Sequence, residues 1–106
     1  MCIRDRDAGG GFRYHARLFE IGLSGASDIR HIEALQGRDY TPVRKRLVCD
    51  LGALPLEQAG NVEGMAWGAR LANGNDTLVL VTDDNFKRNE LSQLLLFEAV
   101  PRAAGR

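Results

Sequence analysis

The stretch that decides the fold spans residues 61–84 and reads NVEGMAWGARLANGNDTLVLVTDD. Two apolar runs, residues 62–67 and residues 77–82, flank a polar segment that contains Asn73-Gly74 and a second asparagine. An Asn-Gly pair between apolar runs is the strongest short-range signal of a β-hairpin. The stretch therefore predicts two antiparallel strands joined by a tight turn.

Acidic residues mark the matching ends of these two predicted strands. Glu63 lies near the start of the first strand, and Asp83, Asp84 and Asn85 follow the second. The start of one strand and the end of the next are adjacent in an antiparallel pair, so we expect these side chains to converge. Carboxylate and amide oxygens suit a hard cation such as Ca²⁺, and carboxylates can act as general acids or bases. The alternative for residues 83–85 is an Asx turn, in which short polar side chains bond their own backbone.

The strand pattern also predicts the surroundings of Glu63. Alternation places Glu63 on one face with Met65 and Trp67, so we expect partial burial of the carboxylate and core packing of Trp67. A buried carboxylate needs a cation, a metal or a proton, and Arg44 or Arg46 could supply the charge instead of a metal.

The rest of the chain predicts further strands. Residues 12–23 and 43–51 show period-two alternation, and Pro42 before the second run favours a position near a sheet edge. Residues 92–100 fit either a helix or a third meander strand, and we favour the strand. Residues 28–35 predict a short helix, with Ser27 or Asp28 as its N-cap. The fold class is all-β with an antiparallel meander.

Composition limits the function classes. The chain has 106 residues, at most one domain, and a formal net charge of zero, so its overall charge gives no argument for nucleic acid or an anionic membrane surface as a partner, and we expect no nucleic-acid partner. No apolar run approaches the roughly 20 residues of a membrane span. Cys2 and Cys49 form no metal-site spacing, and Cys49 fits a buried, inert thiol.

The N-terminal residues differ from the rest. Residues 1–7 have no periodicity, run into three glycines, and resemble a translated sequencing adaptor. They lack the apolar segment of a signal peptide. We expect residues 1–11 to be non-native or disordered, residues 12–100 to form the folded part, and residues 101–106 to be a tail.

The chain resembles the phytase-like family, also described as having the esterase-like activity of phytase. The resemblance lies in residues 23–26, 40–45, 61–71, 77–86 and 93–97. It implies a bacterial periplasmic or secreted protein with a β-propeller-like fold. This chain would then supply the C-terminal blade and part of a neighbouring blade, and the remainder of the propeller would be its partner.

The resemblance also assigns the acidic residues. Glu63 and Asp83–Asn85 match the acidic motifs of the family, which implies hydrolysis of a phosphate or carboxylic ester on a small molecule. From their chemistry, we assign Glu63 and Asp83 as catalytic residues and Glu63, Asp83, Asp84 and Asn85 as ligands of Ca²⁺. The alternative is a non-catalytic β-propeller module for binding or scaffolding, in which the acidic residues are structural.

Overall fold

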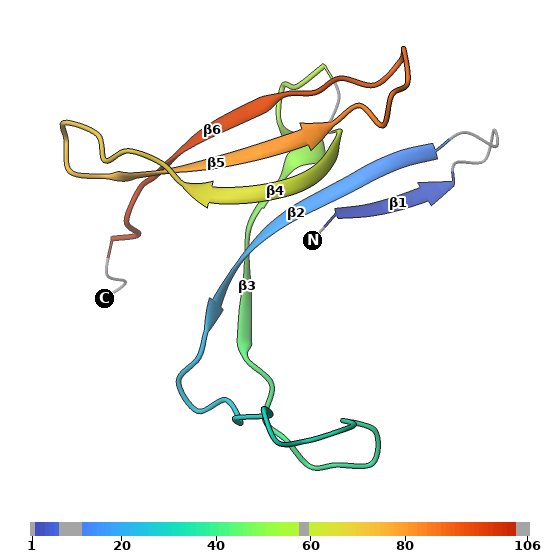
Figure 1. Ribbon diagram of the computed structural model, residues 1–106. Coiled ribbons are helices and arrows are strands. Elements are labelled where there is room, and N and C mark those ends of the chain that lie inside the picture. Colours follow the sequence, from blue (N-terminus) through green and yellow to red (C-terminus); the bar gives the residue numbers. More distant parts are fainter. Residues whose placement is uncertain (1, 7–11, 58–59, 104–106) are drawn as a thin grey trace.

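A computed structural model describes residues 2–6, 12–57 and 60–103 of the chain. These residues form two three-stranded antiparallel sheets, in the orders β1-β2-β3 and β4-β5-β6 (Figure 1). The strands are β1 Cys2–Arg6, β2 Phe12–Gly22, β3 Arg44–Asp50, β4 Asn61–Trp67, β5 Asp76–Asp83 and β6 Leu94–Ala99, with one 3₁₀ turn, η1 Leu51–Ala53. The all-β, antiparallel prediction is confirmed. Among the described residues the sheets close into neither a barrel nor a propeller.

The predicted hairpin is present between β4 and β5. The amide of Gly74 donates to the carbonyl of Leu71, and the amide of Leu71 donates to the carbonyl of Asn75. Gly74 has a φ of 88°, in the left-handed region that glycine adopts at no steric cost. The Asn73 side chain accepts a hydrogen bond from the Asn75 amide and braces the turn.

Residues 92–100, whose sequence fits either a helix or a strand, contain the strand β6. β6 pairs antiparallel with β5, with Leu95 opposite Leu80 and Phe97 opposite Leu78. Leu95 and Phe97 are half-buried against the core, while Leu94, Leu96 and Glu98 are exposed. This alternation is the period of a strand, so packing against β5 decides the conformation that local propensity left open.

The first sheet is built around the long strand β2. β1 pairs with residues 12–16 of β2, and β3 pairs with residues 17–22. β3 is an edge strand, as predicted. Its arginine Arg46 pairs with Glu20 at 2.6 Å, and Lys45 lies over the ring of Phe19.

Residues 2–6 form β1, and the expectation that residues 1–11 are non-native stays a prediction. The prediction of a helix at residues 28–35 is wrong, because these residues form turns and irregular backbone. Asp28 binds both the backbone amide and the guanidinium of Arg30, and Ile29 and Leu35 are exposed. A two-turn helix that packs against nothing has no source of stability.

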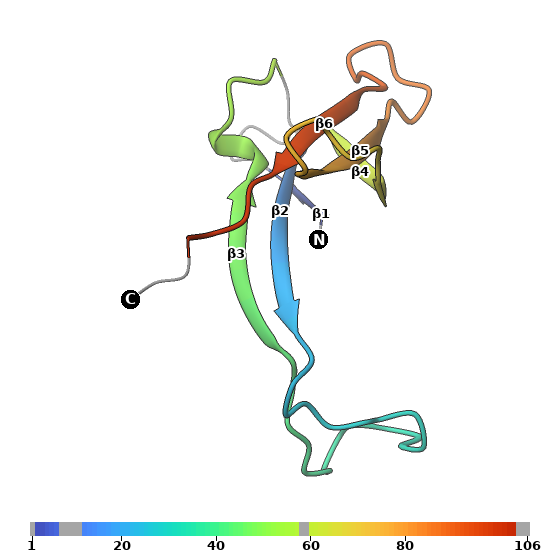
Figure 2. The same ribbon diagram turned by 90° about the vertical axis from the view of Figure 1, so that its left-hand side faces the viewer.

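The core lies where the second sheet crosses the upper part of β2. Ala16, Leu51, Leu78 and Leu80 are buried there. Both views show the β2–β3 ribbon running away from this crossing to the loop of residues 23–43 (Figures 1 and 2). Trp67, predicted in the core, is 70% exposed, so that prediction is wrong. No helix within residues 2–6, 12–57 and 60–103 is long and apolar enough to cross a membrane.

Candidate functional site

The start of β4 and the end of β5 form one rim of the second sheet. The antiparallel register pairs Asn61 with Asp83 and Val62 with Thr82, and then shifts so that Gly64 pairs with Val81. Glu63 is the extra residue of this β-bulge. Bulges often lie beside functional sites because they redirect a side chain. The backbone of the two predicted acidic motifs is therefore adjacent.

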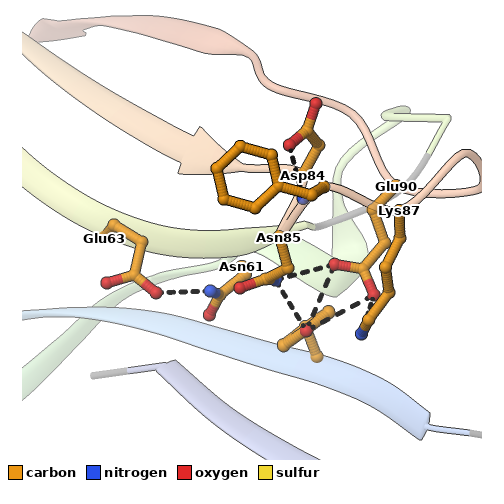
Figure 3. Close-up of polar contacts among 8 residues, drawn as sticks. Asn61, Glu63, Asp84, Asn85, Lys87 and Glu90 are labelled. Carbon is orange, nitrogen blue, oxygen red and sulfur yellow. Dashed lines mark hydrogen bonds and ion pairs between the residues drawn. The ribbon is translucent and has the colours of Figure 1, made fainter.

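Glu63 itself is exposed, so the predicted burial is wrong. Its carboxylate accepts a short hydrogen bond from the side-chain amide of Asn61 (Figure 3). Met65 and Trp67, the residues expected to share its face, are also exposed, so this face is not covered at these positions. Of the two arginines proposed as its partners, Arg46 is paired with Glu20 instead.

The aspartates after β5 have different surroundings. Asp83 is exposed at the last position of the strand, and Asp84 is half-buried. The Asp84 carboxylate accepts a hydrogen bond of 2.9 Å from the backbone amide of Phe86. This is the Asx turn that was the alternative to a ligand role. In Figure 3 the carboxylate of Asp84 points away from the Glu63–Asn61 pair.

Asn85 belongs to a polar cluster that connects the two sheets. Its side-chain amide donates to the Tyr14 hydroxyl at 3.1 Å and to Glu90 Oε2 at 2.8 Å. The Tyr14 hydroxyl donates to Glu90 Oε2 at 3.3 Å. Lys87 Nζ lies 2.7 Å from Glu90 Oε1 (Figure 3). We call Tyr14, Asn85, Lys87 and Glu90 the inter-sheet cluster.

Glu90 is the centre of the inter-sheet cluster. Its side chain is 13% exposed. The hydrogen bonds from Lys87 and Asn85, the positive charge of Lys87 and the Tyr14 hydroxyl lower the pKa of the Glu90 carboxyl from its ordinary value, against the opposing effect of burial. Glu90 is therefore held as a carboxylate by a cation and two neutral donors.

The β5–β6 loop that carries the cluster has a strained backbone. Asn85 and Phe86 both have positive φ, at 51° and 58°. Asparagine tolerates this region, but a bulky aromatic residue there is a genuine outlier. The Phe86 side chain is fully exposed, so no packing explains the conformation. Strain of this kind concentrates at functional sites and switch regions.

The predicted metal ligands do not form one donor set. Glu63 binds Asn61, Asp84 binds the Phe86 amide, and Asn85 binds Tyr14 and Glu90. Over the described parts of the chain, no three His, Cys, Asp or Glu side chains lie close enough together to hold a metal ion. As arranged, these oxygens do not fit a Ca²⁺ ion, which takes about six to eight ligands.

Two cavities lie between the sheets. The larger, of about 1010 Å³, is an apolar groove whose lining includes Met65, Trp67, Phe97 and Val48. The smaller, of about 430 Å³, is lined by residues of β2 and by Glu63. None of the four predicted site residues lines the larger groove, whereas Glu63 lines the smaller cavity.

One protein-family model matches most of the chain. A family model described as "Phytase-like: Esterase-like activity of phytase" matches residues 2–86. The chain belongs to the Phytase-like family. The match covers Tyr14, Glu63 and residues 83–85 of this Phytase-like chain. Residues 93–97, which also resemble the family, lie outside this match. Searches of curated proteins and of solved structures gave no significant match.

Sequence reasoning missed three members of the inter-sheet cluster: Tyr14, Lys87 and Glu90. Tyr14 was interpreted only as part of an alternating strand, and nothing local connects it to a residue 76 positions away. Glu90 had a weak signal, because Lys87 and Glu90 are spaced i, i+3 just after the acidic motif. An Asp-Asp-Asn turn followed by such a pair could have indicated a polar loop folded around one carboxylate.

Proposed function

We propose that this Phytase-like chain contributes to the hydrolysis of a phosphate or carboxylic ester, with Glu63 and Asp83 as the reacting carboxylates. Membership of the family supports the reaction class. The observation that carries the residue assignment is the register of β4 and β5, in which Asn61 is opposite Asp83 and Glu63 is bulged out of the ladder two residues later.

Two exposed carboxylates at one rim suit water-mediated hydrolysis. One of them, ionised, would take a proton from a water molecule, whose oxygen then attacks the phosphorus or the carbonyl carbon. The other, protonated, would give its proton to the departing alcohol oxygen. Asn61, which holds the Glu63 side chain, would orient that carboxylate.

Assistance by Ca²⁺ is a separate proposal, which the observed arrangement of donors does not support. To bind one ion, Asp84 would have to release the Phe86 amide, and Asn85 would have to turn its oxygen away from the inter-sheet cluster. We therefore route no catalytic step through a cation. A calcium titration followed by the melting temperature tests this proposal: a saturable rise that Asp84→Asn abolishes supports it.

The larger architecture is also a proposal. We propose that the β4-β5-β6 sheet is one blade of a β-propeller in a longer periplasmic or secreted bacterial protein. Both faces of this sheet support the idea, because Leu80 and Leu78 face β2 while Leu94 and Leu96, on the other face, are apolar and exposed. A blade with a neighbour on each side needs two apolar faces.

The test of the catalytic proposal uses the longer protein. Glu63→Gln and Asp83→Asn are made separately and assayed on a generic phosphate monoester and a generic acyl ester. We expect each to reduce kcat/KM by about 100-fold or more, because general acid–base catalysis contributes about 10²–10⁴-fold. Glu33→Gln, an exposed carboxylate in the 23–43 loop, is the matched control and should retain activity. Full activity in both site variants would falsify the proposal.

One observation favours a non-catalytic alternative. The side chains of Asp84 and Asn85 are occupied in closing the β5–β6 loop and joining it to Tyr14. In that case the acidic motif is structural, and the propeller serves as a binding or scaffold module. Loss of thermal stability in Asp84→Asn, with ester hydrolysis absent from the wild-type protein, would favour this function.

A further inference from the structure

The two cavities between the sheets adjoin each other. Leu18 and Phe19 of β2 and Met65 of β4 line both the groove of about 1010 Å³ and the smaller cavity of about 430 Å³. Glu63, one of the two proposed reacting carboxylates, lines the smaller cavity, and Trp67 lines the groove. A molecule whose ester group lies beside Glu63 can therefore extend past Met65 into the groove.

The inner face of the second sheet forms the floor of the groove. The register places Trp67 opposite Leu78 and Leu78 opposite Phe97, so these side chains form one apolar row across β4, β5 and β6. Met65, opposite Leu80, belongs to the neighbouring row. Met65 is 63% exposed and Trp67 is 70% exposed, although both lie on the face turned toward β2. Their apolar surface is open to a ligand in the groove.

The β2–β3 ribbon forms the opposite wall of the groove. Ile21 of β2 and Val48 of β3 line it and are 54% and 50% exposed. Both walls belong to this chain and carry exposed apolar side chains. Small-molecule sites are typically clefts of about 300–1,000 Å³ with an apolar and aromatic lining and few polar groups. The groove therefore has the size and the lining of a small-molecule site.

The charged residues of the groove do not favour a highly phosphorylated ligand. Among the described lining residues, Arg46 and Arg102 are balanced by Glu20 and Glu98. Arg46 is paired with Glu20 at 2.6 Å, and Glu98 accepts hydrogen bonds of 2.7 Å from two asparagine side chains. Phosphate groups are recognised by arginine and lysine side chains whose charge no carboxylate offsets. The balanced lining favours an uncharged ligand.

The smaller cavity supplies a polar end to this space. Arg17 and Lys45 line it together with Glu63. Arg17 is paired with Asp50 at 2.9 Å, and Lys45 Nζ lies 4.4 Å from the centre of the Phe19 ring, where the two cavities meet. Charged side chains at one end and an apolar groove at the other match a molecule with a polar carbonyl group and a long apolar chain.

The length of β4 between the two ends sets the length of that chain. Four residues of strand separate Glu63 from Trp67, which corresponds to about 13 Å. An extended alkyl chain of about ten carbons has this length, because each C–C bond of about 1.5 Å advances the chain by somewhat less.

We infer that the groove binds the acyl chain of the substrate, and that this substrate is a carboxylic ester of a linear acid. The inference rests on the proposed hydrolysis for the position of the ester group beside Glu63. Water adds to the ester carbonyl, the bond from this carbon to the alcohol oxygen breaks, and the acid and the alcohol leave. The inference goes further by selecting acyl esters over phosphate esters and by assigning Trp67 and Val48 to substrate recognition.

The fluorescence of Trp67 reports on the groove directly, because the sequence has one tryptophan. The chain is titrated with decanamide, an uncharged analogue of the acyl ester, and with butanamide as the short-chain control. We expect decanamide to give a saturable shift of the emission to shorter wavelength, since its chain covers the exposed indole. Butanamide should bind at least ~100-fold more weakly, because each buried methylene favours binding by about fourfold.

Val48→Glu tests the assignment of the groove. It places a charge among apolar side chains and should weaken decanamide binding at least ~10-fold. Leu47→Glu is the matched control: Leu47 is also 50% exposed, lines neither cavity, and precedes Val48 in β3, so this variant should bind decanamide as the wild type does. Both positions are exposed, so the fold should persist, as circular dichroism will report.

Kinetics of the longer protein separate this inference from the proposed hydrolysis. The kcat/KM for a decanoyl ester should exceed that for the acetyl ester of the same alcohol at least ~100-fold, and Val48→Glu should lower this ratio at least ~10-fold. Hydrolysis without a chain-length preference overturns the inference but leaves the proposed hydrolysis intact, as does decanamide binding that Val48→Glu does not alter. Saturable binding that Val48→Glu weakens, in a protein that hydrolyses neither ester, supports the groove assignment and contradicts the proposed hydrolysis.

Discussion

The Tyr14 hydroxyl of β2 lies 3.3 Å from Glu90 Oε2 in the β5–β6 loop, although 76 positions separate the two residues. This contact, together with the bond from Asn85, is a polar link between the two sheets beside their small apolar core. It also anchors the loop that begins with the acidic motif of the Phytase-like chain.

Removing the Tyr14 hydroxyl should loosen this link. We expect Tyr14→Phe to lower the free energy of unfolding by about 0.5–1.5 kcal/mol, because a typical hydrogen bond contributes that much. The exposed Tyr40→Phe is the control and should be neutral. Chemical denaturation at one protein concentration measures both. In a double-mutant cycle, Tyr14→Phe and Glu90→Gln should be non-additive; additive effects would mean that the two side chains do not interact.

Stability should depend on the ionisation of Glu90. Because its pKa in the folded chain is lowered from the ordinary value of 4.5, the unfolded state binds more protons, and stability rises with pH in this region. The contribution is complete above pH 4.5 and is lost as the pH falls through the folded pKa. Glu90→Gln should flatten the acid limb of a stability–pH curve, whereas Glu33→Gln should leave the limb unchanged. Equal slopes in Glu90→Gln and wild type would contradict this account.

Buried Thr82 should contribute through hydrogen bonds that the sequence does not reveal. Its hydroxyl donates to the Leu91 carbonyl and accepts from the Gln93 amide, both at 2.9 Å, and the side chain is 1% exposed. Thr82→Val keeps the shape but leaves both groups unsatisfied, which should cost about 1–3 kcal/mol. Thr41→Val, at an exposed loop position, is the control. A Thr82→Val variant as stable as wild type would show that solvent or another group replaces these bonds.

The strands of this fold were predictable because their signals are local. Alternation in β2 and β3, and the Asn-Gly turn between β4 and β5, each act within a few residues. Trp67 and Glu63 were misjudged for a shared reason: alternation says which residues share a face, but not whether anything covers that face.

The site was less predictable than the sheets. The adjacency of Asn61 and Asp83 follows from the hairpin, and so the acidic rim was accessible to sequence reasoning. The inter-sheet cluster was not, because it depends on how β2 crosses the second sheet. That crossing is fixed by the packing of Ala16 and Leu51 with Leu80, which no local pattern encodes.

The strained loop offers a final prediction. Phe86 has a φ of 58° and an exposed side chain, so Phe86→Gly removes the steric cost of the left-handed conformation and loses no packing. We expect the variant to be more stable by up to about 1 kcal/mol, since strained residues cost on the order of 1–3 kcal/mol and glycine returns part of that as backbone entropy. Phe86→Ala retains the Cβ and should give no gain. If both variants are equally stable, the Phe86 backbone is unstrained, and the aromatic side chain, not the φ angle, sets the stability of the loop.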